Sequence, residues 1–276
     1  RFIAGVRLRR FFRAARPTQI LTFGTSSSSA SLPVTMANGW VPTPEQIGQQ
    51  WDSRTRALVI ATPSNPTGAV LTLDQLGGIS ARVAELGGAL IVDEIYQGLS
   101  YEVEPITALS LDTDYLFVVN SFSKYFGMTG WRIGWLVVPE SFVPVMEKLA
   151  QNLYLSAPTL AQYAALAAMQ PETVAILEER RAEFRRRRDF LYPALQKLGF
   201  GLAAKPQGAF YLYADCSQLT DDSFAFCEHL LEAAGVAITP GKDFGLNAPL
   251  RYMRFAYTTS VERMQLAIER LGQAIG

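Results

Sequence analysis

The chain has 276 residues, which favours two packed domains, and its 49% hydrophobic and 18% charged residues are typical of a globular protein. The 25 basic and 25 acidic residues give a formal net charge of zero, so no overall field favours nucleic acid or an anionic membrane, and neither is expected as a partner. A single histidine, His229, argues against His-based catalytic triads and multi-histidine metal centres, and we predict no metal site.

Two features bear on the cellular compartment. The sequence holds no run of about 18 apolar residues that could span a bilayer and does not open on a basic-then-apolar signal segment. Its two cysteines, Cys216 and Cys227, are too few for a disulfide framework and are predicted to be reduced packing residues. We expect a cytoplasmic or organellar matrix protein and assign it to the cytoplasm.

Residues 1–44 differ in composition from the rest of the chain. They contain six arginines, no lysine and no acidic residue, which leaves residues 45–276 with a net charge of −6. They also carry the low-complexity run Thr25–Ser31, with no period of 2 or 3.6 residues around it. An Arg-rich, Ser-rich, acid-poor composition is typical of a transit peptide, but we interpret residues 1–44 as a disordered or non-native arm.

Beyond this arm, predicted strands and helices alternate. Residues 56–61 form a short apolar run that ends in a cluster of turn formers, which predicts a buried strand. Helical spacing of apolar residues over 72–86 precedes a second buried strand at 89–93. Strand, helix and strand over this length predict a crossover unit, and hence a parallel sheet covered by helices on both faces. Apolar runs at 115–119 and 131–138 add two strands.

The second half of the chain predicts a different arrangement. Helical spacing over 171–198 indicates a long helix, and we place the arginines 185–188 on its polar face, with a nucleic-acid patch as the minor alternative. A strand at 208–213, a helix at 221–234 and a strand that ends at 254–257 follow. His229 lies on the second of these helices and is interpreted as structural or surface-exposed.

Polar side chains stand at the downstream end of each predicted strand. These are Asn65, Asp93, Ser121 and Lys124. In an open α/β sheet, ligands bind outside the carboxyl ends of the strands, so these side chains are expected to converge. Each residue alone could have a purely structural role, as a turn former, a helix cap or an exposed loop charge. Lys124 stands out because it is the first lysine of the chain and the only one before Lys148.

Three motifs in order carry a family resemblance. Ser64–Gly68 (SNPTG), Asp93–Tyr96 (DEIY) and Ser121–Gly134 (SFSKYFGMTGWRIG) resemble the signature of class I/II aminotransferases, the pyridoxal-phosphate enzymes of fold type I. The resemblance extends from about residue 40 to the C-terminus. It implies an α/β fold: a mostly parallel three-layer sheet domain, the partial cofactor-binding domain, over 45–165, and a smaller α+β C-terminal domain over 166–276.

One part of the family pattern is absent. Members of this family usually carry roughly another hundred residues before the Asn-Pro motif, in keeping with a larger two-domain chain. Residues 1–40 do not resemble that region. The resemblance therefore implies a truncated fold type I chain without the turn that binds the cofactor phosphate and the ring that stacks on the pyridine.

The resemblance implies catalytic roles for three residues. Lys124 would form the Schiff base with pyridoxal 5'-phosphate and then carry the proton from the substrate α-carbon, as general base and acid. Asp93 would keep the pyridine nitrogen protonated by ion pairing. Tyr96, together with Asn65, would hydrogen-bond the phenolic oxygen of the cofactor.

It also implies two anion contacts. Ser121 and Arg132 match positions that bind the cofactor phosphate, for which the planar guanidinium is well suited. Arg254 matches the arginine that grips the substrate α-carboxylate, beside Asn65. Arg251, three residues earlier, is the rival for this role, and Arg254 is preferred because the residues after it fit the pattern without a shift.

The function implied by the resemblance is that of a pyridoxal-phosphate-dependent aminotransferase. It would move an amino group between an amino acid and a 2-oxo acid through Lys124, and members of the family are usually homodimers. The alternatives are another reaction of the same scaffold, a β-lyase or a decarboxylase, because the cofactor supports several reactions. A noncatalytic remnant is the alternative of another class, and the atypical residues 1–44 are the feature that favours it.

Overall fold

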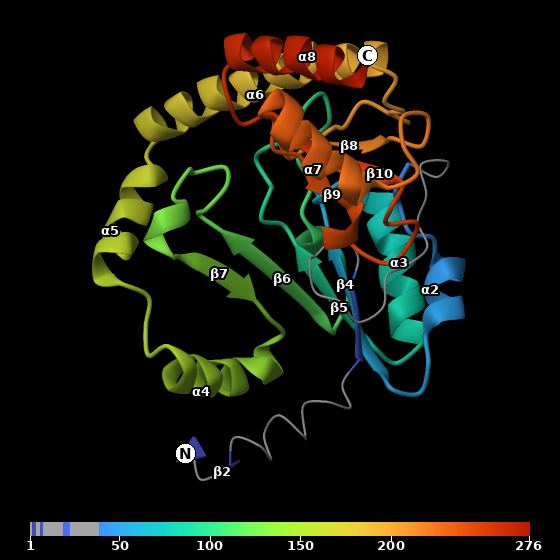
Figure 1. Ribbon diagram of the computed structural model, residues 1–276. Helices are drawn as coiled ribbons and strands as arrows, with labels where there is room; N and C mark the ends of the chain where they lie inside the picture. Colours follow the sequence, from blue (N-terminus) through green and yellow to red (C-terminus); the bar gives the residue numbers. More distant parts are fainter. Residues whose placement is uncertain (1, 4–5, 8–18, 23–38) are drawn as a thin grey trace.

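The computed structural model describes residues 2–3, 6–7, 19–22 and 39–276 (Figure 1). The strands are β1 (Phe2–Ile3), β2 (Val6–Arg7), β3 (Gln19–Thr22), β4 (Thr55–Ala61), β5 (Ala89–Asp93), β6 (Leu116–Ser121), β7 (Gly134–Val137), β8 (Tyr211–Asp215), β9 (Thr239–Pro240) and β10 (Tyr252–Ala256). The α-helices are α2 (Pro44–Gln50), α3 (Leu73–Glu85), α4 (Val143–Leu153), α5 (Thr159–Ala168), α6 (Pro171–Lys197), α7 (Ser223–Ala234) and α8 (Val261–Ile275). None of these helices is long and apolar enough to cross a membrane.

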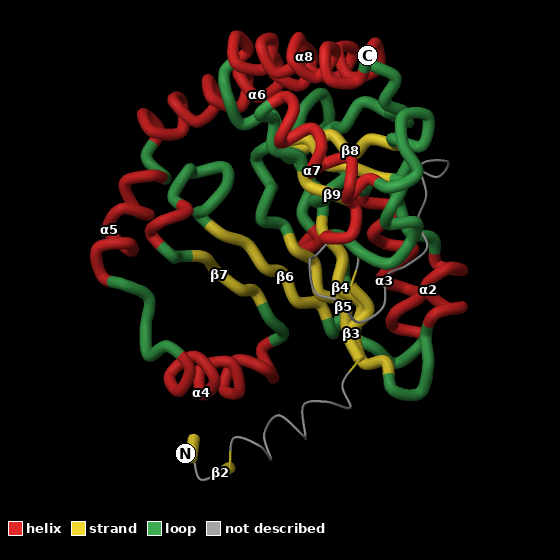
Figure 2. Tube along the Cα trace, viewed as in Figure 1, coloured by secondary structure: helices red, strands yellow, loops and turns green. Residues whose placement is uncertain are grey.

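The larger sheet has five strands in the order β3-β4-β5-β6-β7 (Figure 2). Strands β3 to β6 are parallel, and β7 runs antiparallel to β6. The predicted α/β fold with a mostly parallel sheet is therefore confirmed. The composition of residues 1–44 predicts no helix or strand, yet β3 lies within this segment and pairs with β4. The run Thr25–Ser31 lies outside the described residues. The domain division at 44/45 and 165/166 stays a prediction.

Helices α2 and α3 cover one face of this sheet. Each begins at a threonine, Thr43 and Thr72, that forms a capping box with a glutamine three residues later. Burying their apolar stripes against the sheet removes hydrocarbon from water, and this stabilises the layer. The residues of this core are Ile47, Leu58, Ile60, Leu71, Leu76, Ile79, Val83, Leu90, Val92, Ala108, Leu116 and Val118.

The opposite face of the sheet is covered less completely by the described residues. Leu116 packs on the α3 side, so the next residue of the strand, Phe117, points to the other side. Phe142, just before α4, contacts Phe117 with ring centroids 5.0 Å apart. Val59 and Ile91 on this face are half-buried. The predicted helical layer on both faces is thus denser on the α3 side among the residues described.

The second half of the chain forms a smaller α+β unit. Its three-stranded antiparallel sheet has the order β8-β10-β9, and α6, α7 and α8 pack around it (Figure 1). Cys216 and Cys227 are free and buried in this core, as predicted. His229 stacks on Phe226 on the exposed side of α7, with centroids 6.4 Å apart. The predicted helix over 171–198 corresponds to α6, and the small C-terminal unit is confirmed.

One prediction about α6 is wrong. The helical spacing predicts Arg188 on the polar face of the helix with its neighbours, but its side chain is 0% exposed. The sequence pattern missed this because the partner that compensates the buried charge, Glu102, lies 86 residues earlier in the chain. Arg186, in contrast, is exposed as predicted.

Candidate active site

The predicted site residues stand at one edge of the larger sheet. Asp93 is the last residue of β5 and Ser121 the last of β6, while Asn65 follows β4 and Lys124 follows β6. Because β4, β5 and β6 are parallel, their carboxyl ends meet at the same edge. The turn formers after each apolar run end the strand where its backbone leaves the ladder.

The amine of Lys124 faces two aromatic rings. Its Nζ lies 5.6 Å from the ring centroid of Tyr96 and 5.8 Å from that of Phe210. Burial lowers the pKa of Lys124, the positive charge of Arg254 lowers it further, and the negative charge of Asp93 opposes this shift. The neutral, nucleophilic amine is therefore present at a lower pH than for an exposed lysine.

Asp93 presents a carboxylate to the same space. Its Oδ1 accepts a hydrogen bond of 3.0 Å from the backbone N–H of Ile95. Burial raises the pKa of Asp93, whereas this hydrogen bond and the charge of Lys124 act in the opposite direction. A half-buried carboxylate opposite an amine is suited to hold a cationic nitrogen between them.

Tyr96 is part of a hydroxyl pair that the sequence analysis did not find. Its Oη lies 2.9 Å from the Oη of Tyr211, the first residue of β8. Burial raises the pKa of Tyr96 well above its ordinary value, so the phenol stays protonated and can donate a hydrogen bond. Tyr211 stands in a predicted strand, but only the packing of the smaller unit on the sheet shows that it reaches Tyr96.

Arg254, on β10, completes the cluster. Its Nη1 donates to Asn65 Oδ1 at 2.9 Å and its Nη2 donates to Thr239 Oγ1 at 3.2 Å. The guanidinium carbon lies 4.4 Å from the ring centroid of Tyr211 and 4.7 Å from that of Phe244. Within the described part of the chain its buried Nε has no hydrogen-bond partner. Both terminal nitrogens of the guanidinium are held by partners, so its orientation in the cluster is fixed.

The rival arginine lies outside this cluster. Arg251 is exposed, and its Nη2 pairs with Asp215 Oδ2 at 2.6 Å. The Asp215 carboxylate of this pair is buried at the end of β8, so the pair holds Arg251 there. The geometry therefore places Arg254, and not Arg251, beside Asn65 and in electrostatic reach of Lys124.

Ser121 and Arg132 flank the cluster. Ser121 Oγ lies 2.9 Å from Ser123 Oγ and 3.2 Å from the carbonyl oxygen of Ile133, so the turn that contains Arg132 closes onto the end of β6. Arg132 itself is in the left-handed region with φ 52°, is exposed, and donates from Nη1 to the carbonyl oxygen of Thr129 at 3.0 Å. These hydrogen bonds of Ser121 and Arg132 stay within the segment 121–133 and do not join the two residues to the other predicted residues.

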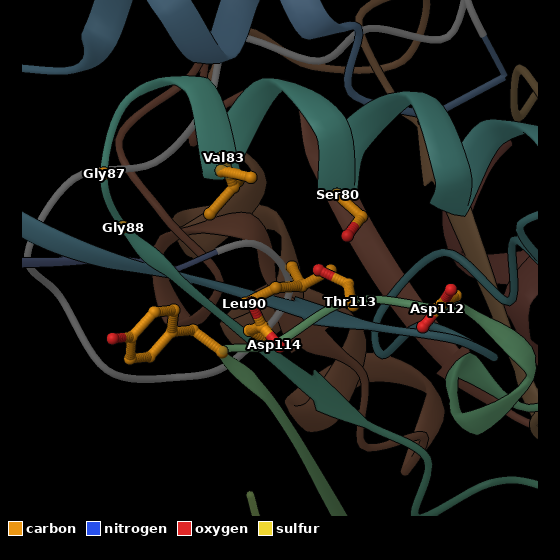
Figure 3. A pocket seen from close by; sticks show the side chains of 10 residues that line it. Ser80, Val83, Gly87, Gly88, Leu90, Asp112, Thr113 and Asp114 are labelled. Carbon is orange, nitrogen blue, oxygen red and sulfur yellow. The ribbon is translucent and has the colours of Figure 1, made fainter.

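A separate cavity of about 490 Å³ lies at the opposite edge of the sheet (Figure 3). It is formed by the end of α3 and the segments that precede β5 and β6, which are the amino ends of these parallel strands. None of the predicted site residues lines it; the lining residues are Ser80, Val83, Ala84, Gly87, Gly88, Leu90, Asp112, Thr113, Asp114 and Tyr115. Ligands of such sheets bind at the carboxyl ends, so we do not assign the site to this cavity.

Known proteins are similar to this chain in sequence and in fold. The chain is 39% identical over 222 residues to a valine–pyruvate aminotransferase of Mycobacterium tuberculosis, covering 80% of this chain and 57% of the relative. It is 38% identical over 240 residues to an aspartate/prephenate aminotransferase of Thermus thermophilus, covering 86% of this chain and 61% of the relative. The chain thus spans about three fifths of the length of these relatives.

Solved structures agree with these matches. The aspartate aminotransferase from Thermus thermophilus with maleate superposes with a TM-score of 0.85 at 34% identity, covering 92% of this chain and 69% of the other. An aminotransferase from Mycobacterium tuberculosis gives a TM-score of 0.86 at 33% identity, covering 93% and 70%. The sequence model for aminotransferase class I and II matches residues 26–271. The chain belongs to the class I and II aminotransferase family.

Proposed function

We propose that this protein is a pyridoxal-phosphate-dependent aminotransferase that moves an amino group between an amino acid and a 2-oxo acid. One observation carries the proposal: Lys124 Nζ lies 5.6 Å from the ring centroid of Tyr96, whose hydroxyl lies 2.9 Å from that of Tyr211, and the Arg254 guanidinium carbon lies 4.4 Å from the ring centroid of Tyr211. Asp93 stands at the end of β5, three residues before Tyr96. Such a transfer requires a nucleophilic amine, a carboxylate that pairs with the cofactor nitrogen, and a guanidinium that binds the substrate carboxylate, all at one edge of the sheet. The family of the chain supports the same reaction.

The donor set fits pyridoxal phosphate. Asp93 supplies a half-buried carboxylate for the pyridine nitrogen, and the protonated Tyr96 supplies a donor for the phenolic oxygen, with the amide of Asn65 nearby. Ser121 offers a hydroxyl for the phosphate at the end of β6. Arg132 stands in the adjoining turn and would have to turn from Thr129 to join it. The residues present therefore suit the group.

When bound, pyridoxal phosphate would withdraw electrons from the α-carbon of the amino acid attached to it. Lys124 would bond to the aldehyde of the cofactor through Nζ, and after its release by substrate this atom would take the α-proton and return it. Asp93 would hold the proton at the ring nitrogen. Arg254, oriented by Asn65 and Thr239, would fix the substrate α-carboxylate.

A single-turnover experiment tests this function. The protein is loaded with pyridoxal phosphate and mixed with amino acids one at a time, and the 2-oxo acid is quantified. We expect one 2-oxo acid per loaded site and conversion of the cofactor to its amine form. Release of ammonia or carbon dioxide instead would indicate a lyase or a decarboxylase. A folded protein that takes up no cofactor would indicate a noncatalytic remnant.

Arg254→Lys is expected to weaken substrate binding selectively. A lysine cannot reproduce the planar fork that donates to both Asn65 and Thr239. Losing one charge-assisted pair costs about 1.5–3 kcal/mol, so KM for both the amino acid and the 2-oxo acid should rise roughly 10- to 100-fold. Steady-state kinetics measure this, with Arg251→Lys as the matched control. Equal effects of both substitutions would refute the assignment of Arg254.

The pH dependence of cofactor attachment follows from the lowered pKa of Lys124. Only the neutral amine attacks an aldehyde, so attachment should rise with pH and reach half its maximum below the ordinary range of a lysine. In Arg254→Gln the charge that lowers this pKa is lost, and the midpoint should move to higher pH. Stopped-flow absorbance at a series of pH values measures it. A wild-type midpoint equal to that of free lysine would contradict the burial argument.

We also propose that the protein acts as a homodimer in the cytoplasm. The four residues of β7 are all exposed, and large apolar side chains on the neighbouring helices are exposed as well, which supports an interface there. Those on the helices are Val145, Leu149, Leu153, Leu160, Tyr163 and Leu166. The two free, buried cysteines suit a reducing compartment. Light scattering of the purified protein should give the mass of two copies.

A further inference from the structure

The rings that border Lys124 belong to a short segment of the smaller unit. Residues 206–211, here called the strap, lead into β8 and carry Phe210, which faces the Lys124 amine, and Tyr211, which bonds Tyr96. The strap packs closely on the SNPTG turn: the N–H of Gly208 donates to the carbonyl oxygen of Gly68 at 3.0 Å, and a Cβ on Gly68 would lie 2.5 Å from Pro206 Cβ. The position of the strap therefore sets the walls of the candidate active site.

The strap includes a residue in a costly conformation. Ala209 has φ 57°, in the left-handed region that residues with a Cβ rarely adopt. Its carbonyl oxygen accepts hydrogen bonds from Tyr101 Oη at 2.6 Å and Tyr257 Oη at 3.2 Å, and its N–H donates to the carbonyl oxygen of Leu99. Such a conformation persists only where surrounding contacts hold it, so the neighbours of the strap determine its shape.

The charged group that reaches the strap is Arg188. Its Nη1 donates to the carbonyl oxygen of Pro206 at 2.9 Å and to Glu102 Oε2 at 3.0 Å, and its Nη2 donates to Glu102 Oε1 at 2.8 Å. Its Nε donates to Asp189 Oδ1 at 2.9 Å, and its guanidinium carbon lies 4.9 Å from the ring centroid of Tyr101. One side chain thus ties α6, the loop after β5 and the strap together.

The burial of Arg188 calls for an explanation other than stability. Its side chain is 0% exposed, and taking a guanidinium out of water costs as much as its ion pairs return. Glu102, its bidentate partner, is itself in the left-handed region with φ 59°. Arg188 thus bonds one residue with positive φ, Glu102, directly, and bonds the segment that contains the other, Ala209, through Pro206, and this arrangement fixes the geometry of the strap.

We infer that Arg188 is a positioning residue of this site, holding the strap so that Phe210 and Tyr211 stand against Lys124, Tyr96 and Arg254. The inference rests on the proposed function for its effect on turnover, because Arg188 touches none of the reacting groups itself. Arg185 on α6 also pairs with Glu102, at 3.0 Å, but it is exposed. Arg186 is exposed as well and pairs with Glu183 on the same helix.

The test compares Arg188→Lys with the matched control Arg186→Lys, both first shown to be folded by circular dichroism. In Arg188→Lys, hydrogen exchange at the amides of Gly208 and Ala209 should be roughly tenfold faster or more, because a lysine cannot bond Pro206 and Glu102 together. The control should exchange as the wild type does. This readout needs no cofactor, so it decides the inference even if the wild type binds no pyridoxal phosphate.

Two readouts on the loaded protein separate positioning from mere stability. Displacing Phe210 exposes Lys124, so the pH midpoint of cofactor attachment should rise in Arg188→Lys. Displacement of Phe210 and Tyr211 from the candidate active site should lower kcat/KM by about 100-fold. A folded Arg188→Lys with wild-type exchange in the strap and an unchanged midpoint would overturn the inference. If Arg188→Lys does not fold, Glu102→Gln takes its place, and unchanged exchange in the strap of that variant would overturn it equally.

Discussion

Lys124→Ala is expected to abolish covalent attachment of the cofactor and to lower kcat by about 10⁴-fold or more. The reason is that one atom, Nζ, would serve both as the nucleophile toward the cofactor aldehyde and as the carrier of the α-proton. No other described lysine is placed beside Asp93 and the aromatic rings of Tyr96 and Phe210. Absorbance after loading and steady-state kinetics measure the two losses.

Lys148→Ala is the matched control. Lys148 lies on the exposed surface of α4. Its substitution removes the same charge from the chain as Lys124→Ala does, but at a position outside the cluster. It should retain wild-type attachment and turnover. If Lys124→Ala kept even a tenth of the wild-type kcat while folded, the assignment of Lys124 would be wrong.

Asp93→Asn is expected to have the second largest effect. A neutral amide cannot keep the ring nitrogen of the cofactor protonated, and losing one preorganised electrostatic contact costs about 10²–10³-fold in kcat. The substitution also removes the charge that opposes the lowered pKa of Lys124, so the pH midpoint of cofactor attachment should move down. Kinetics and a pH series of attachment rates measure the two changes together.

The control for this substitution is Asp112→Asn. Asp112 borders the cavity at the opposite edge of the sheet and is exposed. It should change neither kcat nor the midpoint. A folded Asp93→Asn within a factor of two of the wild-type kcat would show that Asp93 does not act on the cofactor.

Most of the sheet was predictable from local patterns. The runs that became β4, β5 and β6 are apolar and end in turn formers, and the helical spacing over 72–86 matches α3 within one residue at each end. Once the strands are parallel, their carboxyl ends must meet, and this alone brings Asp93, Lys124 and Asn65 to one edge. The strand β3 was missed because four residues of mixed polarity carry no period.

The parts of the site that the sequence did not predict come from the smaller unit. Phe210 lies beside Lys124, Tyr211 bonds Tyr96 and Thr239 bonds Arg254, and no spacing along the chain encodes these contacts. The burial of Arg188 escaped the helical pattern for the same reason, since its partner Glu102 is remote in sequence. Long-range packing decided each of these positions.

The most direct test of the account is to locate the lysine that binds the cofactor. The wild-type protein is incubated with pyridoxal phosphate, reduced with borohydride, digested and analysed by peptide mass spectrometry. The account predicts one modified peptide, with the added mass on Lys124. Modification at Lys148, Lys197, Lys205 or Lys242 instead, or no modified peptide from a folded sample, would contradict it.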